Sequence, residues 1–236
     1  MVAKKQMPDF KKFEDLAGII FKDKNLLKQA FTHRSYLNEN RNLEINHNER
    51  LEFLGDAVIE LLVTEYLYQK YPDNTEGDLT AYRASLVNAD TLSEVARKIG
   101  VNDFLLLSKG ETKDTGKARQ YILANTIEAI IGAIYLDQGY DAAKYFVSKN
   151  VYHLIDKIVE EKSWVDAKSM FQEKSQEFAN TTPLYKTIKE EGPDHDKHFT
   201  IGVYLGNDFV AEGLGKSKQE AEQVAARKAL EIKKWM

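Results

Sequence analysis

The sequence contains no cysteine among its 236 residues. This absence excludes disulfide-stabilised scaffolds, zinc sites with thiolate ligands, iron–sulfur clusters and thiol nucleophiles. A reducing compartment is consistent with it. Any resident metal would have to be held mainly by oxygen ligands, which favours a hard cation over zinc.

Long apolar runs and a strong excess of one charge are also missing. The longest apolar stretch, residues 129–136, is far too short to span a bilayer, and residues 1–8 lack the apolar core of a signal peptide. Lys and Arg total 33 against 37 Asp and Glu, so the net charge of −4 does not point to a polyanionic partner. These features predict a cytoplasmic protein without a membrane segment.

The apolar pattern divides the chain into two predicted domains, residues 1–162 and 166–236. In the first, apolar residues recur at helical spacing, and no segment shows the alternation of a strand. In the second, a helix is expected at 167–179, followed by strands at 184–189, 198–205 and 209–212. A last helix has an apolar face formed by Ala221, Val224, Ala225, Ala229 and Ile232. The predicted fold is an all-α domain followed by an α+β domain of order α-β-β-β-α.

Acidic residues form a stripe on one predicted helix of the first domain. At ~100° per residue, Glu49, Glu52 and Asp56 fall within an arc of about 60°. Glu128 lies in a second, otherwise apolar helix, with Asn125 one turn before it on the same side. A glutamate in that context is largely desolvated unless it has a partner.

If the two helices face each other, several carboxylates converge. Two such charges ~5 Å apart repel by roughly 3 kcal/mol at an effective dielectric of about 20, so they need cations or protons to coexist. Oxygen ligands favour Mg²⁺, with Mn²⁺ as a substitute. Acid stripes are more often solvated helix faces, but Gly55 favours the metal site because a glycine inside a helix usually marks the close approach of another backbone.

Four segments then carry a family resemblance. Residues 48–57 (NERLEFLGDA) resemble the signature of the ribonuclease III family, and residues 30–36 (AFTHRSY) resemble its upstream block. Residues 76–79 (EGDL) and 129–137 (AIIGAIYLD) are similar to two further blocks in the same order. The resemblance extends over essentially the whole chain.

This resemblance implies a Mg²⁺-dependent homodimeric endonuclease that cuts double-stranded RNA in rRNA and mRNA processing. Each protomer would cut one strand, leaving 5′-phosphate and 3′-hydroxyl ends with short 3′ overhangs. The implied metal ligands are Glu52, Asp56, Asn125 and Glu128, of which Asp56 and Glu128 are catalytic. Glu49 and Glu76 would support the site around the dimer cleft, and Phe53 would insert into the partner subunit.

One position departs from the family pattern. The family commonly has Asp where this chain has Asn125, so the site loses one negative charge and Mg²⁺ is expected to bind more weakly.

The second domain resembles a double-stranded RNA-binding domain, through its element order and residues 215–222 (GKSKQEAE). Its net charge is about −1, so only local clusters can bind a polyanion. The resemblance implies phosphate contacts from Lys216, Ser217 and Lys218, and minor-groove contacts from Ser169, Gln172, Glu173, Gln176 and His195. Short polar side chains of this kind suit the shallow minor groove of A-form RNA. A nucleotide cofactor is not expected, because Val210 stands where a Walker A loop needs glycine.

Two other classes of protein stay open at this point. The first is a catalytically weak or inactive double-stranded RNA-binding protein that retains the nuclease fold, favoured by Asn125 alone. The second is a carboxylate-bridged metal oxidase, weakened because only one Glu-x-x-His segment is present, at residues 44–47.

Overall fold

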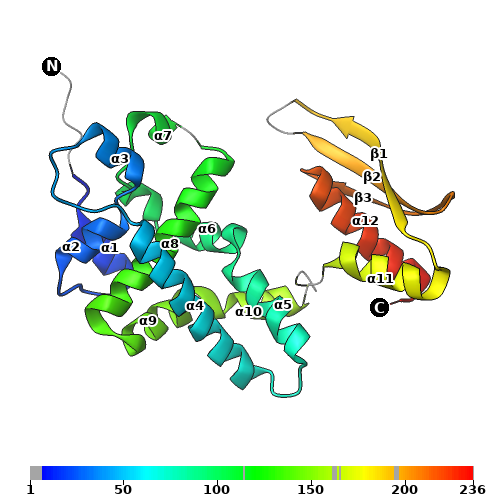
Figure 1. Ribbon diagram of the computed structural model, residues 1–236, viewed down its shortest axis with the longest axis horizontal. Helices are drawn as coiled ribbons and strands as arrows, with labels where there is room; N and C mark the ends of the chain where they lie inside the picture. Colours follow the sequence, from blue (N-terminus) through cyan, green and yellow to red (C-terminus); the bar gives the residue numbers. More distant parts are fainter. Residues whose placement is uncertain (1–6, 114, 161–163, 165, 194–196, 236) are drawn as a thin grey trace. The chain divides into compact units, whose positions relative to one another are not determined.

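The computed structural model describes residues 7–113, 115–160, 164, 166–193 and 197–235. The chain forms two compact units, residues 1–164 and 165–236 (Figure 1). In the described part of the chain, no helix is long and apolar enough to cross a membrane.

The first unit is helical, as the apolar periodicity predicts. Within its described residues, the only β pairing outside the helices is an isolated bridge between Thr32 and Leu106. Its elements are α1 Phe10–Ala17, α2 Lys24–Ala30, α3 Arg34–Glu39, α4 Glu49–Lys70, α5 Glu76–Val87, α6 Ala89–Lys98, a 3₁₀ helix Val101–Phe104, α7 Lys109–Lys113, α8 Lys117–Gln138, α9 Tyr140–Val147, a π-helix Ser148–Tyr152 and α10 Leu154–Glu160.

The long helix α4 ends just before a proline in the sequence. Its last residue is Lys70, two positions before Pro72, which cannot supply a backbone donor to a continuing helix. The next helix, α5, then begins with a capping box. The Thr75 hydroxyl accepts the backbone N–H of Asp78 at 3.2 Å, and the Asp78 carboxylate accepts the backbone N–H of Thr75 at 3.0 Å.

Helices α4 and α8 cross at the centre of this unit with their backbones in contact (Figure 1). A Cβ placed on Gly55 of α4 would lie 1.7 Å from the backbone oxygen of Glu128, and a Cβ on Gly132 of α8 would lie 2.2 Å from that of Leu51. The interpretation of Gly55 as a point of close backbone approach is therefore confirmed. Around the crossing, α8 is buried on nearly every side, with Ile127, Ile130, Ile131, Ala133 and Ile134 fully covered.

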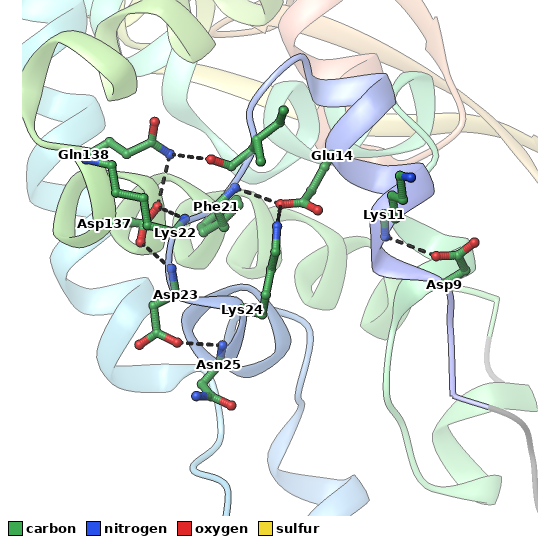
Figure 2. A network of polar contacts seen from close by, with 11 residues as sticks. Asp9, Lys11, Glu14, Phe21, Lys22, Asp23, Lys24, Asn25, Asp137 and Gln138 are labelled. Atoms are coloured by element: carbon green, nitrogen blue, oxygen red, sulfur yellow. Dashed lines mark hydrogen bonds and ion pairs between the residues drawn. The ribbon is translucent and has the colours of Figure 1, made fainter.

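The C-terminal end of α8 anchors the N-terminal segment (Figure 2). The Asp137 carboxylate accepts the backbone N–H groups of Lys22 and Asp23, each at 2.8 Å. The Gln138 side chain donates to the backbone oxygen of Ile20 at 3.2 Å. These contacts fix the approach to α2, so the segment that precedes the site is fastened to the helix that carries Glu128.

The second unit has the predicted α-β-β-β-α order. It consists of α11 Ala167–Ala179, β1 Pro183–Glu191, β2 His198–Leu205, β3 Asp208–Gly215 and α12 Lys218–Lys233. The three strands form an antiparallel sheet in sequence order, and Gly206, with φ +61°, makes the tight turn between β2 and β3. Both helices cover one face of the sheet around Phe171, Val203 and Ala225 (Figure 1).

Two details of this unit differ from the sequence-based prediction. The outer strands extend beyond their apolar residues, because backbone pairing continues through Glu190 opposite Phe199 and Glu191 opposite His198. Ile232, expected on the buried face of the last helix, is 61% exposed. At that end the core is closed by Trp235, which stacks on Phe171 with ring centroids 5.6 Å apart.

The glycine contact gives a stability prediction. Gly55→Ala should lower the free energy of unfolding by about 3 kcal/mol or more, because its methyl group meets a backbone oxygen that no side-chain rotation can remove. Urea denaturation measures the effect. Gly77→Ala is the matched control, since its Cβ has space in α5 and alanine favours a helix. Equal stability of the two variants would contradict the close contact.

Candidate active site and RNA-binding surface

The α4–α8 crossing brings the predicted acidic residues together. Glu52 and Asp56 flank Gly55 on α4, and Gly55 lies against the backbone of Glu128 on α8. The charges of Asp56 and Glu52 both act on Glu128, and the Asn125 side chain hydrogen-bonds to Glu52. The four predicted metal ligands therefore lie around one point of the fold.

Burial and mutual repulsion make this cluster unusual. Burial, together with the charges of Asp56 and Glu52, raises the pKa of the Glu128 carboxyl from its ordinary 4.5 to about 8. Burial also raises the pKa of Glu52, helped by the charges of Glu49 and Asp56 and opposed by the Asn125 hydrogen bond. Among the described residues, no Lys, Arg or His forms an ion pair with Glu128. Without a metal, the cluster therefore relieves its repulsion by keeping a proton on Glu128.

The donor set fits a hard divalent cation. Its members offer carboxylate and amide oxygens, the ligands that Mg²⁺ and Mn²⁺ prefer. In the part of the chain that the structure describes, however, no three His, Asp, Glu or Cys side chains already stand in a coordinating arrangement. Binding of a cation would therefore require the carboxylates of the cluster to move closer together around it.

A pocket of about 310 Å³ opens beside the cluster and contains two residues that the sequence did not single out. His33 and Tyr121 line it together with Glu49, Glu52 and Asn125. The His33 ring nitrogen Nδ1 hydrogen-bonds to the Ser35 hydroxyl at 2.8 Å, and burial lowers the pKa of His33. Tyr121 precedes Asn125 by one helical turn, and this spacing is the signal that would have indicated it.

Two other acids of the predicted site, Glu49 and Glu76, occupy different surroundings. Glu49 lies at the edge of the cluster, 3.5 Å from Arg34 and 3.7 Å from His47. Glu76 begins α5, accepts a hydrogen bond from Thr80 at 3.2 Å and lines a separate pocket, so the fold of one chain does not bring it to the cluster.

Glu60 continues the acidic stripe of α4 without joining the cluster. It pairs with Arg83 at 2.7 Å, which neutralises its charge. Stripe position alone therefore does not identify a member of the cluster.

Phe53 projects from α4 into solvent. Its side chain is 81% exposed, and it lines a pocket of about 640 Å³ with Leu54 and Leu136. A large exposed aromatic residue beside an apolar hollow is typical of a surface that another chain covers.

The predicted RNA contacts of the second unit lie on two exposed segments. Those on α11 are all exposed: Ser169, Gln172, Glu173 and Gln176. Lys216, Ser217 and Lys218 are exposed at the start of α12, where the Ser217 hydroxyl caps the helix by accepting the backbone N–H of Glu220 at 3.2 Å. His195 lies outside the described residues.

Comparison with protein families agrees with both units. Residues 23–155 match the family model described as Ribonuclease-III-like, and residues 167–233 match the one described as Double-stranded RNA binding motif. The chain belongs to the ribonuclease III family. It is therefore an endonuclease, as the signature at residues 48–57 predicts.

Individual relatives match the chain over nearly its full length. Ribonuclease 3 of Bdellovibrio bacteriovorus is 44% identical over 224 residues, covering 94% of this chain and 95% of the relative. Ribonuclease 3 of Enterococcus faecalis is 46% identical, covering 90% and 92%. The solved nuclease domain of Campylobacter jejuni ribonuclease III is 42% identical and covers 63% of this chain and 97% of that domain, with a TM-score of 0.55.

The raised pKa of Glu128 gives a pH prediction for this chain. Without a divalent metal, Glu128 keeps its proton up to about pH 8 when folded but loses it near 4.5 when unfolded. Between these values the folded state binds more protons, so this residue's contribution to stability falls as pH rises. The melting temperature of Glu128→Gln minus that of the parent, measured in EDTA, should therefore increase from about pH 5.5 to about pH 8.

Comparing the variant with its parent isolates this residue. The lowered pKa of His33 acts in the opposite direction, but it acts in both proteins and cancels in the difference. Glu60→Gln, which removes an acid of α4 that already pairs with Arg83, serves as the control. If the difference in melting temperature between Glu128→Gln and its parent were the same at every pH, Glu128 would not have a raised pKa in the folded state.

Proposed function

We propose that this chain hydrolyses phosphodiester bonds in double-stranded RNA in a divalent-metal-dependent reaction. The observation that carries the proposal is the pair of facing acidic helices, with Glu128 half-buried where α4 and α8 touch and without a basic partner among the described residues. Residues 1–162 act as the nuclease domain, and residues 166–236 act as the RNA-binding domain. The products carry 5′-phosphate and 3′-hydroxyl ends with short 3′ overhangs, and the substrates belong to rRNA and mRNA processing in the cytoplasm.

Glu52, Asp56, Asn125 and Glu128 would hold Mg²⁺, with Mn²⁺ as a substitute. When bound, the cation supplies Lewis-acid activation of water and charge neutralisation at the scissile phosphate. The chain's own part is to keep acidic oxygens fixed around one point by the backbone contact between α4 and α8. Asp56 is exposed and faces incoming RNA, whereas Glu128 is half-buried and holds its position through packing. We assign the catalytic roles to these two residues.

The second unit binds the duplex in this proposal. Lys216, Ser217 and Lys218 contact phosphates, and the exposed side chains of α11 contact 2′-hydroxyls in the minor groove. Such contacts depend on duplex shape more than on base sequence. The RNA-binding unit would therefore deliver many different double-stranded stems to the nuclease unit.

We further propose that two chains form the active enzyme. Phe53 inserts into an apolar pocket of the partner subunit, and Glu49 and Glu76 support the site around the cleft between the subunits. The exposed Phe53 beside the pocket at Leu136 supports this assembly. The solved nuclease domain of Campylobacter jejuni ribonuclease III has a region involved in dimer formation.

The test is cleavage of a long RNA duplex in Mg²⁺ and in EDTA. We expect cuts only with Mg²⁺. Glu128→Gln should reduce the cleavage rate by more than about 100-fold, because loss of a residue that only supports a metal ligand already costs about 10–100-fold. Binding of the duplex should stay intact in this variant. A gel for products and a mobility shift in EDTA for binding measure the two quantities separately.

Glu60→Gln is the matched control for this experiment. It removes an acid from the same stripe of α4, one that Arg83 already neutralises, and should cleave like the parent. A mobility shift without cuts by the parent protein would favour the inactive RNA-binding alternative. Full cleavage by Glu128→Gln would remove that residue from the active site.

Asn125 gives a second prediction. Asn125→Asp adds a carboxylate next to Glu52 and should lower the Mg²⁺ concentration required for half-maximal cleavage by about three- to tenfold, because ligand charge tunes the affinity of oxygen sites. Asn42→Asp adds the same charge at an exposed position outside the cluster and should leave the requirement unchanged. A Mg²⁺ titration of cleavage rate measures this, and an unchanged midpoint for Asn125→Asp would show that this position is not a ligand.

A further inference from the structure

The start of α12 already holds a negative group from another part of the chain. The Glu190 carboxylate, near the end of β1, pairs with the ammonium group of Lys218 at 2.9 Å. The same carboxylate pairs with Lys197, just before β2, at 3.3 Å. One acid therefore joins two lysines that are 21 residues apart in the sequence.

An aromatic ring completes this cluster. The ammonium groups of Lys218 and Lys197 lie 5.6 Å and 5.9 Å from the centre of the Phe199 ring. Strand pairing places Phe199 opposite Glu190, so β1 and β2 hold the carboxylate and the ring side by side. The two lysines are thereby positioned around a single anion rather than spread over the surface. We call Glu190, Lys197, Phe199 and Lys218 the Glu190 cluster.

The charges in this cluster are fully formed. Hydrogen bonds from Lys218 and Lys197 lower the pKa of Glu190, so its carboxylate is ionised at neutral pH. A carboxylate oxygen and a phosphate oxygen make the same charge-assisted hydrogen bonds to an ammonium group. A phosphate of the RNA backbone that reaches Lys218 must therefore compete with Glu190.

We propose that Lys197 is a phosphate-binding residue alongside Lys218, and that Glu190 is an internal competitor which the RNA backbone displaces from both lysines. The inference rests on the proposed binding of double-stranded RNA by residues 166–236. Glu190 keeps the lysines in place in the free protein and weakens binding at the same time. The exchange replaces one anion by another, so the cluster sets the affinity and salt dependence of binding without selecting a base sequence.

A neighbouring residue on the same strand offers a matched control. Glu191 is also exposed and pairs with Lys189 at 2.7 Å, outside the Glu190 cluster. Glu190→Gln and Glu191→Gln remove the same charge from adjacent positions. A general effect of net charge on RNA binding would be equal in the two variants, whereas displacement of a competitor would appear in only one.

The experiment measures binding of the full chain to a short RNA duplex in EDTA, over a range of KCl concentrations. Glu190→Gln should bind about threefold more tightly than the parent at low salt, the scale of two exposed ion pairs, while Glu191→Gln should change little. The gain should shrink as salt screens the charges. Lys197→Ala should weaken binding and reduce the slope of log affinity against log salt by about one.

A combined variant separates competition from a structural role. In a chain with both Lys197→Ala and Lys218→Ala, Glu190→Gln should give no more gain than Glu191→Gln, because the lysines it blocks are gone. Looser binding by Glu190→Gln, or equal effects of the two glutamine variants, would overturn the inference. Failure of the parent chain to bind the duplex would instead overturn the proposed function, so the two failures are distinguishable.

Discussion

The backbone contact between Gly55 and Gly132 is the constraint on which the nuclease unit depends. Because neither residue has a side chain, α4 and α8 approach until the Cα region of one lies against the peptide groups of the other. The charges of Glu52 and Asp56, near Gly55 on α4, then act on Glu128 of α8. Glu128 is a neighbour of Glu52 and Asp56 for this reason, although it lies 72 positions after Asp56 in the sequence. The same contact excludes larger residues and fixes the depth of the cluster.

This packing has an electrostatic consequence that runs against stability. Acids brought together in a half-buried place repel each other, and the raised pKa of Glu128 expresses that cost. An acid paired with a basic residue does not carry this cost, and Glu60, paired with Arg83, is an example on α4. The cluster instead keeps a proton on Glu128 when no metal is bound, and in the proposed function a cation would take the place of that proton.

The second unit carries the double-stranded RNA binding motif although its net charge is about −1. The lysines that we propose as phosphate contacts lie at the start of α12 and beside Phe199, and Lys197 and Lys218 are already paired with a glutamate. Exposed pairs of this kind contribute little to stability. Their influence on binding can be larger where, as proposed for Glu190, the carboxylate occupies a place that a phosphate would otherwise take.

The sequence by itself determined the classes of both units, the order of their elements and the helical face that carries the acids. Helical periodicity, strand alternation and the signature around Gly55 are local patterns, so they can be identified in the sequence without knowledge of the fold. The tertiary structure alone decided which acids meet. Glu60 and Asp56 lie on the same acidic stripe in the sequence. In the fold, Glu60 pairs with Arg83 on α5, whereas the charge of Asp56 acts on Glu128. The pocket residues His33 and Tyr121, the exposure of Ile232 and the pairing of Glu190 with two distant lysines likewise depend on contacts between segments far apart in the chain. No single stretch of sequence contains that information, because it arises only when the helices and strands pack.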